Sequence, residues 1–254
     1  MNLSAVILTK NEEQNIQACL EALDFVDEKV VIDDFSNDKT LDIAQRLGAR
    51  VFKKHLNGDF ARQRNYGLEK ANGRWALFVD ADERVIAGLK EEILRAIRNI
   101  NVVGYRVIRR DFMFGKGLKY GEFTKRGPFG NASILRLGRK GAGSWTRRVH
   151  EYWDIRGRVK NLKAPLFHYP HPTLKEFIES INYFSSLHAK TLVAEGKRPN
   201  LLKVVVWPVG KFIYNMVFRL GFLDGAEGFV VAFIMSFNSF LGWAKAWINQ
   251  KYLP

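Results

Sequence analysis

Two aspartates that lie two positions apart, Asp80 and Asp82, follow an apolar run at Trp75–Val79. In an extended or turning segment, this spacing lets both carboxylates face one point. It also lets one carboxylate face a metal ion while the other faces a ligand that the ion holds. Carboxylates suit hard cations such as Mg²⁺ and Mn²⁺, which keep several waters and share phosphate oxygens with a substrate. The spacing is also common in surface turns, so its meaning depends on the elements around it.

The first hundred residues alternate short apolar runs with helical patterns. This alternation predicts βαβ units with right-handed crossovers, and hence an α/β sandwich with a mostly parallel, doubly wound sheet. The expected strands are Leu3–Thr9, Lys29–Asp33, Arg50–Lys53 and Trp75–Val79. The expected helices between them are Glu13–Leu23, Thr40–Leu47 and Phe60–Lys70.

Polar residues follow three of these strands. In parallel α/β sheets, ligands bind beyond the carboxyl ends of the strands, so we expect these residues to converge on one edge. They are Thr9, Lys10, Asn11 and Glu12 after the first strand, Asp33, Asp34, Ser36, Asn37 and Asp38 after the second, and Asp80, Asp82 and Glu83 after the fourth. Asp33 and Asp38 have an alternative as turn and cap residues before the helix at Thr40.

The middle of the chain differs in pattern and in charge. Strands are expected at Gly104–Arg110, Ser133–Leu137 and Val149–Ile155, followed by a long helix at Thr173–Glu195. Residues 104–163 hold 16 Lys and Arg against four Asp and Glu, whereas residues 1–103 hold 15 against 17. A field this basic attracts an anionic partner, which could be nucleic acid, an anionic membrane surface or a phosphorylated substrate. A solvated basic face is the alternative.

Composition narrows the class of protein. A hydrophobic content of 47% with 26% charged residues is typical of a globular chain. The single Cys19 cannot form an internal disulfide, and no Cys/His spacing indicates zinc, which favours a reducing, cytoplasmic setting. The first residues lack a basic region and a long apolar run, so no signal peptide is expected.

Three segments in order carry a resemblance to a known family. They are ILTKNEE, VVIDDFSNDKT and ARQRNYGLEKANGRWALFVDADE, within roughly residues 3–100. This pattern resembles the family 2 glycosyltransferases, which have the GT-A fold. RVHEYW at 148–153 and the apolar C-terminus resemble, more loosely, the bacterial subgroup that extends the lipopolysaccharide inner core.

The resemblance implies a metal-dependent hexosyltransferase that uses Mg²⁺ or Mn²⁺. It would move a sugar from a nucleotide-sugar, typically a UDP-sugar, to an anionic saccharide or glycolipid such as lipopolysaccharide core. It implies a GT-A domain over residues 1–200, with a donor half at 1–103 and an acceptor half at 104–200. Residues 201–254 would form apolar helices after it.

The resemblance also implies roles for residues of the donor half. Thr9 and Glu12 would line the nucleotide pocket, and Asp33 and Asp34 would contact the uracil or ribose. The remaining matches are Arg64 and Asn65, facing the donor from the third helix, Asp80, holding the ribose, and Asp82, holding the metal that bridges the diphosphate. A solvated helix face is the alternative for Arg62 or Arg64.

An inverting transfer needs a base that takes the proton from the acceptor hydroxyl. His150 and Glu151 are the candidates, and neighbours on a strand point to opposite faces, so one of the two would face the site. The resemblance favours Glu151 as the base and leaves His150 to substrate binding, with a surface ion pair as the alternative for Glu151. His168 would reach the metal or the diphosphate, with a structural role before the helix at Thr173 as its alternative.

The C-terminal segment is apolar. Within Val204–Leu223, Lys211, Asn215 and Arg219 recur every four positions, which predicts an amphipathic helix with a narrow basic stripe. Phe229–Ala244 runs sixteen residues without a charge, short of the ~20 expected of a spanning helix. Residues 201–254 are therefore expected either to lie in a membrane interface, peripheral on the inner face of the cell membrane, or to pack against a second subunit, and the two are compatible. A plain intrachain core is the third alternative.

Two other functions fit parts of the sequence. A basic nucleic-acid-binding protein would explain residues 104–163, but no recognition motif is visible and the charge lies in the half expected to receive the acceptor. A non-catalytic nucleotide-sugar-binding domain would not need the Asp80/Asp82 pair. A dinucleotide-binding enzyme is not expected, because Lys10-Asn11-Glu12 after the first strand is not glycine-rich.

Overall fold

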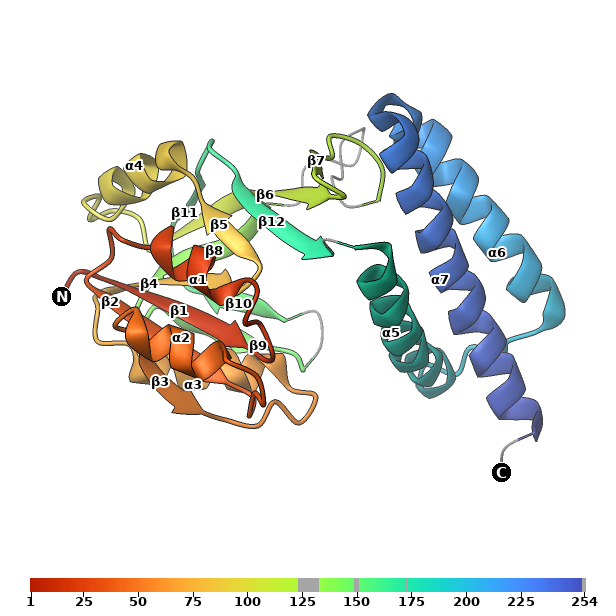
Figure 1. Cartoon of the computed structure of the whole chain (residues 1–254), viewed down its shortest axis with the longest axis horizontal. Coiled ribbons are helices and arrows are strands. Elements are labelled where there is room, and N and C mark those ends of the chain that lie inside the picture. Colours follow the sequence, from red (N-terminus) through yellow and green to blue (C-terminus); the bar gives the residue numbers. More distant parts are fainter. Residues whose placement is uncertain (123–132, 149–150, 172, 253–254) are drawn as a thin grey trace. The chain divides into compact units, whose positions relative to one another are not determined.

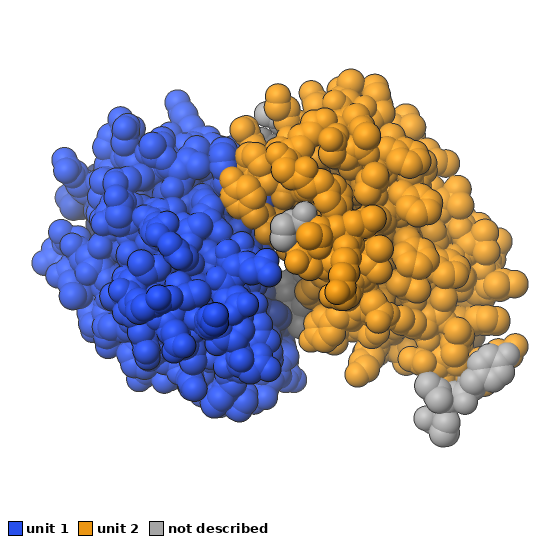
Figure 2. Space-filling model, viewed as in Figure 1, with its two compact units in different colours: residues 1–109, 133–168 blue, residues 110–132, 169–254 orange. Residues whose placement is uncertain are grey.

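The structure is a computed structural model that describes residues 1–122, 133–148, 151–171 and 173–252. Two compact units make up the chain (Figure 2). The first comprises residues 1–109 and 133–168, and the second comprises residues 110–132 and 169–254.

Four parallel strands form the first half of the main sheet, in the order β3-β2-β1-β4. They are β1 (Leu3–Thr9), β2 (Glu28–Asp33), β3 (Arg50–Lys53) and β4 (Trp75–Asp80). The helices that connect them are α1 (Ile16–Glu21), α2 (Thr40–Arg46) and α3 (Phe60–Lys70) (Figure 1). The expected βαβ alternation is confirmed, and α1 is shorter than predicted because residues 12–15 form a turn, closed by a hydrogen bond from Asn15 N to Glu12 O.

Antiparallel strands extend the sheet beyond β4. β8 (Ser133–Arg139) pairs with β4, β6 (Gly104–Met113) pairs with β8, and β12 (Leu166–His171) pairs with β5 (Glu83–Val85). The shorter elements are β7 (Lys116–Gly117), β11 (Val159–Asn161), the separate hairpin of β9 (Gly143–Thr146) and β10 (Tyr152–Ile155), and α4 (Ala87–Ala96). The sequence did not predict β5 and α4. The strand predicted at Val149–Ile155 begins at Tyr152 within the described residues.

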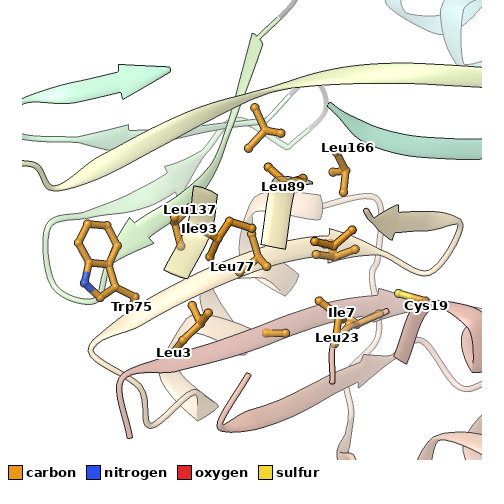
Figure 3. Packing of buried hydrophobic residues seen from close by; sticks show 14 of the residues in the cluster. Leu3, Ile7, Cys19, Leu23, Trp75, Leu77, Leu89, Ile93, Leu137 and Leu166 are labelled. Atoms are coloured by element: carbon orange, nitrogen blue, oxygen red, sulfur yellow. The ribbon is translucent and has the colours of Figure 1, made fainter. Parts of the chain in front are cut away.

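Helices cover both faces of this sheet, because successive side chains of a strand point to opposite faces. Leu3 and Ile7 pack with Leu23, after α1, and with Leu89 and Ile93 of α4 (Figure 3). The opposite face packs against α3 and the β9–β10 hairpin through a second cluster, which includes Val6, Ile32, Leu68, Phe78, Trp145 and Trp153. Gly67 lets α3 approach closely, since an added Cβ would lie 2.4 Å from Val6 Cγ1.

The second unit is built mainly from three helices. They are α5 (Leu174–Ala194), α6 (Leu201–Ile213) and α7 (Gly225–Tyr252), with a π-helical turn at Tyr214–Phe218 and a 3₁₀ turn at Gly221–Asp224 between α6 and α7. Both α5 and α6 pack against α7. The side chains of Thr173 and Asn200 cap the first turns of α5 and α6 by accepting from backbone N–H groups. The C-terminal helices predicted from the sequence are confirmed, and α7 extends beyond the expected Phe229–Ala244 at both ends.

Candidate active site

The carboxyl end of β4 carries an ion network around Asp80. Arg136, on β8, donates from Nη2 to Asp80 Oδ2 at 2.6 Å and to Glu83 Oε1 at 3.1 Å. Arg64, on α3, donates from Nη2 to Asp80 Oδ1 at 3.0 Å. Burial alone would raise the pKa of Asp80, but the two guanidinium groups outweigh burial and hold that pKa well below its usual range. Asp80 is therefore an ionised and firmly positioned carboxylate.

Arg64 joins this network to the segment before β10. Its Nε donates to Glu151 Oε1 at 2.9 Å, and its guanidinium lies over the ring of Trp145 at 4.8 Å from the centroid. Arg64 is 4% exposed, so the alternative of a solvated helix face fails for Arg64 and fits the exposed Arg62 instead. The side chain of Glu151 is only 16% exposed, so this ion pair is not a surface pair.

Two sheet elements place Glu151 and His168 beside the aspartates. The β9–β10 hairpin packs on β4 through edge contacts of Phe78 with Trp145 and Trp153, which fixes the start of β10 near Arg64. The antiparallel register of β12 and β5 sets His168 opposite Glu83. His168 thereby reaches Asp82, with Nε2 3.2 Å from Oδ2.

The carboxyl ends of β1 and β2 form a second polar cluster around Asp34. Its carboxylate lies 2.9 Å from Lys10 Nζ and 3.4 Å from His55 Nδ1, and it accepts from Leu56 N at 3.1 Å. Burial acts to raise the pKa of Asp34, but these donors outweigh it and lower that pKa. The rings of Phe35 and His55 stack beside it with centroids 3.8 Å apart. This cluster combines a carboxylate, a lysine and an aromatic surface.

Three other predicted residues are placed within the first unit. Thr9 is buried at the end of β1, and its hydroxyl has no hydrogen-bond partner among the described residues. The carboxylate of Asp33 accepts from both the backbone N–H and the hydroxyl of Ser36, as in a turn. Asn65 exchanges two hydrogen bonds of 2.8 Å with the backbone of Trp145, which ties α3 to β9. His150 lies outside the described residues.

Glu12 sits in the turn after β1, where its carboxylate accepts from Asn15 Nδ2 at 2.9 Å. Burial raises the pKa of Glu12 from 4.5 to about 7, and the charges of Asp82 and Asp38 add to the rise. Asn15 and Arg84 oppose the rise without cancelling it. The side chain therefore changes charge near neutral pH, close to the other acidic groups of the site.

A Glu12→Gln variant should lose part of the pH dependence of stability. Because the folded pKa exceeds the ordinary value, the folded state keeps a proton that the unfolded chain releases above pH 4.5. The free energy of unfolding should then fall as pH rises from about 4.5 to about 7, by roughly 2–3 kcal/mol, and the variant should lack this fall. Urea unfolding across this pH range measures the effect, with Glu21→Gln on α1 as the exposed control. An unchanged slope in Glu12→Gln would contradict the assignment.

The sequence did not single out several residues that the structure brings to the site. Arg136 stands between Leu135 and Leu137 in a buried strand, and a charge in such a run signals a buried partner without identifying it. No sequence pattern pointed to Phe35 and His55 as site residues, because their stacking depends on the pairing of β2 with β3.

The protein is similar to known proteins over nearly its full length. The model of the family described as "Glycosyl transferase family 2" matches residues 4–150. A lipopolysaccharide core biosynthesis glycosyltransferase, LpsC of Rhizobium meliloti (strain 1021), is 32% identical over 262 residues, which cover 98% of this chain and 93% of the relative. An uncharacterized glycosyltransferase of Rickettsia bellii (strain RML369-C) is 27% identical over a match that covers 96% of this chain and 85% of that relative.

A solved structure shares the fold. Residues 1–349 of S. aureus TarS, solved in complex with UDP-GlcNAc, superpose with a TM-score of 0.52 at 14% sequence identity. The match covers 99% of this chain and 92% of that one. At this identity, the likeness concerns the fold alone.

Proposed function

The chain belongs to glycosyl transferase family 2 and is a glycosyltransferase, and from this premise we propose that it moves a hexose from a UDP-sugar to an anionic glycolipid. One observation carries the proposal. Asp34, Asp80 and Asp82 follow strands of one parallel sheet, and Lys10, Arg64 and His168 contact them from neighbouring elements. This is the edge of a parallel sheet at which ligands bind.

The cluster around Asp34 suits the nucleoside part of the donor. Its carboxylate can accept from a uracil N–H or a ribose hydroxyl, and the exposed ring of Phe35 offers a surface on which a base can stack. The unpartnered hydroxyl of Thr9 is one further group that a nucleotide could satisfy. The UDP-GlcNAc bound by TarS, which shares the fold, supports uridine as the nucleoside.

The donor atoms at Asp82 fit a divalent cation. Asp82 Oδ2 and His168 Nε2 are 3.2 Å apart, close to the roughly 3 Å between neighbouring ligands of an octahedral ion with bonds of about 2.1 Å. The described part of the chain contains no group of three His, Cys, Asp or Glu that could hold a metal, so diphosphate oxygens and water would complete the shell. Asp82 and His168 would hold Mg²⁺ or Mn²⁺, which when bound neutralises charge on the departing diphosphate.

Glu151 is the proposed base of an inverting transfer. Its carboxylate would take the proton of the acceptor hydroxyl while that oxygen bonds to the anomeric carbon and the bond to the diphosphate oxygen breaks. Arg64 holds Glu151 and Asp80 together and so keeps the base at a fixed place beside β4. His150, which the sequence assigned to substrate binding, remains a proposed contact.

The acceptor is proposed to be a phosphorylated or otherwise anionic saccharide of lipopolysaccharide core. The 32% identical relative is a lipopolysaccharide core biosynthesis glycosyltransferase, which supports this class, and the basic residues of the 104–163 segment would attract such a molecule. With a lipid-linked acceptor, we propose that the enzyme acts at the cytoplasmic face of the cell membrane.

A screen of nucleotide-sugars by thermal shift tests the proposal. UDP-sugars should raise the melting temperature more than GDP- or CMP-sugars, and the rise should be larger with Mn²⁺ or Mg²⁺ than with a chelator. An acceptor-free assay of UDP release then separates an enzyme from a non-catalytic binding domain. Stabilisation by no nucleotide-sugar, together with stabilisation by RNA or DNA, would contradict the proposed function.

A further inference from the structure

The outward surface of the two C-terminal helices is apolar over most of its length. From Leu201 to Ile248, every exposed residue is Gly, Ala or a large apolar or aromatic residue, and we call these side chains the apolar face. Val206, Trp207, Phe218 and Phe233 are each more than half exposed. A water-facing surface of this length and composition is unusual, because soluble proteins rarely expose large contiguous apolar patches.

The polar groups of the same segment point inward. Glu122 gathers three of them: Asn215 donates to Oε2 at 2.6 Å, Lys211 lies 3.3 Å from Oε1, and Arg219 donates to the backbone O at 3.0 Å. The basic stripe that the sequence predicts within Val204–Leu223 therefore faces inward, on α6 and on the π-helical turn that follows it. A helix in water shows the reverse arrangement, whereas charged and polar groups of a helix in lipid face the protein interior.

Aromatic and basic residues gather where α6 begins and α7 ends. The rings of Trp207 and Trp243 stack with centroids 6.3 Å apart, and Lys203 lies over Trp243. Lys251 likewise lies over Trp247. Trp243 is buried, so the exposed Trp207 with Lys203 and Lys251 are the groups that can meet lipid headgroups, where tryptophan and lysine are typical.

Charge distinguishes a bilayer from a second copy of the chain as the covering partner. The end where α6 begins and α7 ends is basic, and the acidic residues of the 201–254 segment, Asp224 and Glu227, lie near the other end. A two-fold pairing that brings this end of two copies together would set like charges near each other, which disfavours that arrangement. Anionic lipid attracts the same end, by about 1 kcal/mol for each Lys or Arg near the surface.

Two helical segments, Leu201–Phe218 and Gly221–Lys251, are long and apolar enough to cross a membrane by length and composition. The packing favours a flat orientation instead. α5 packs along α7 and carries exposed charges near both of its ends, at Lys175 and Lys190, which a spanning α7 would draw into hydrocarbon. The continuous helical segment Leu201–Phe218 has 18 residues, about 27 Å, slightly less than a hydrocarbon core of about 30 Å.

We propose that the apolar face binds an anionic bilayer, with α6 and α7 lying in the plane of its interface and the inner polar groups facing the protein. Phe229, Phe233, Phe237 and Phe240 recur at helical spacing on one side of α7 and insert together among the acyl chains. This inference deepens the proposed function and rests on it only for the acceptor, since a glycolipid acceptor resides in such a bilayer.

Vesicle sedimentation of the full chain tests this inference. Vesicles contain phosphatidylcholine alone or mixed with phosphatidylglycerol, and the test variant is Val206→Asp combined with Phe233→Asp. Both sites are exposed, so folding should persist. The wild type should bind the mixed vesicles more tightly than the neutral ones. The double variant should bind the mixed vesicles at least about tenfold more weakly than the wild type does. The matched control Ile100→Asp changes an exposed apolar residue of the first unit and should bind as the wild type does.

Three further measurements separate the other outcomes. UDP affinity by calorimetry should be equal in all three proteins; if no protein binds UDP while vesicle binding persists, the proposed function fails and the membrane inference stands. The inference is overturned in favour of a second copy if the wild type does not bind vesicles and forms a dimer in ultracentrifugation, while the double variant is monomeric. Tryptophan quenching should be stronger with lipids brominated near the headgroup than near the chain end, and the reverse order overturns the interfacial depth of the apolar face.

Discussion

An Asp82→Asn variant is expected to lose transfer by about a thousandfold or more while remaining folded. The proposed cation contributes several kcal/mol to neutralising the leaving diphosphate, and each 1.36 kcal/mol changes a rate tenfold. The asparagine amide keeps the size of the carboxylate but loses its charge and one metal-binding oxygen. Because Asp82 is partly exposed and its contact is with His168, the surrounding packing should not change. Transfer is measured as UDP release with an anionic saccharide acceptor over a range of Mn²⁺ concentrations.

Mn²⁺ binding gives a readout that does not depend on activity. The affinity for Mn²⁺ in the presence of UDP, measured by electron paramagnetic resonance, should fall in Asp82→Asn and to a lesser extent in His168→Gln. Asp154→Asn, at an exposed position of β10, is the matched control and should leave both readouts unchanged. If Asp82→Asn bound Mn²⁺ and turned over normally, Asp82 would be excluded as a metal ligand.

The parallel half of the fold could be predicted from sequence because its strands are buried on both faces. Such strands read as continuous apolar runs, and the run at Leu3–Thr9 matches β1 residue for residue. The edge strand β3 is partly exposed, and its predicted bounds at Arg50–Lys53 also match. β5 could not be predicted, because three residues carry no periodic pattern and its partner β12 lies about 80 residues later. α4 follows β5 directly and was missed with it.

The site could be predicted where it depends on position along a strand, and not where it depends on long-range pairs. The location of Asp80 and Asp82 after an apolar strand identified the edge at which Arg64 and His168 meet them, and Glu151 joins this edge through Arg64. The bond between Arg136 and Asp80 joins residues 56 positions apart through the antiparallel pairing of β8 with β4, which no local pattern indicates.

Helix α6 illustrates a different limit. Its periodicity shows which residues share a face, and Lys211, Asn215 and Arg219 do share one. Periodicity cannot show which face is inward, because that depends on the partner groups that other segments bring. Here Glu122 draws the polar face inward and leaves the apolar face outside.

A Glu151→Gln variant should transfer sugar about 10²- to 10⁴-fold more slowly than the wild type, the range that a positioned general base contributes. UDP affinity should be unchanged, since the glutamine carbonyl can still accept from Arg64 Nε and keep Arg64 on Asp80. Glu69→Gln, on the exposed surface of α3, is the matched control.

The split between turnover and UDP affinity distinguishes a base from a residue that only positions Arg64. A base acts on the proton of the acceptor hydroxyl, so Glu151→Gln should lower kcat and leave the affinity for UDP unchanged. If Glu151 acted only through Arg64, the variant would weaken UDP binding, and Arg64→Gln combined with Glu151→Gln would cost no more than Arg64→Gln alone. Near-normal turnover in Glu151→Gln would remove Glu151 from the mechanism and direct the search for the base to its neighbour, His150.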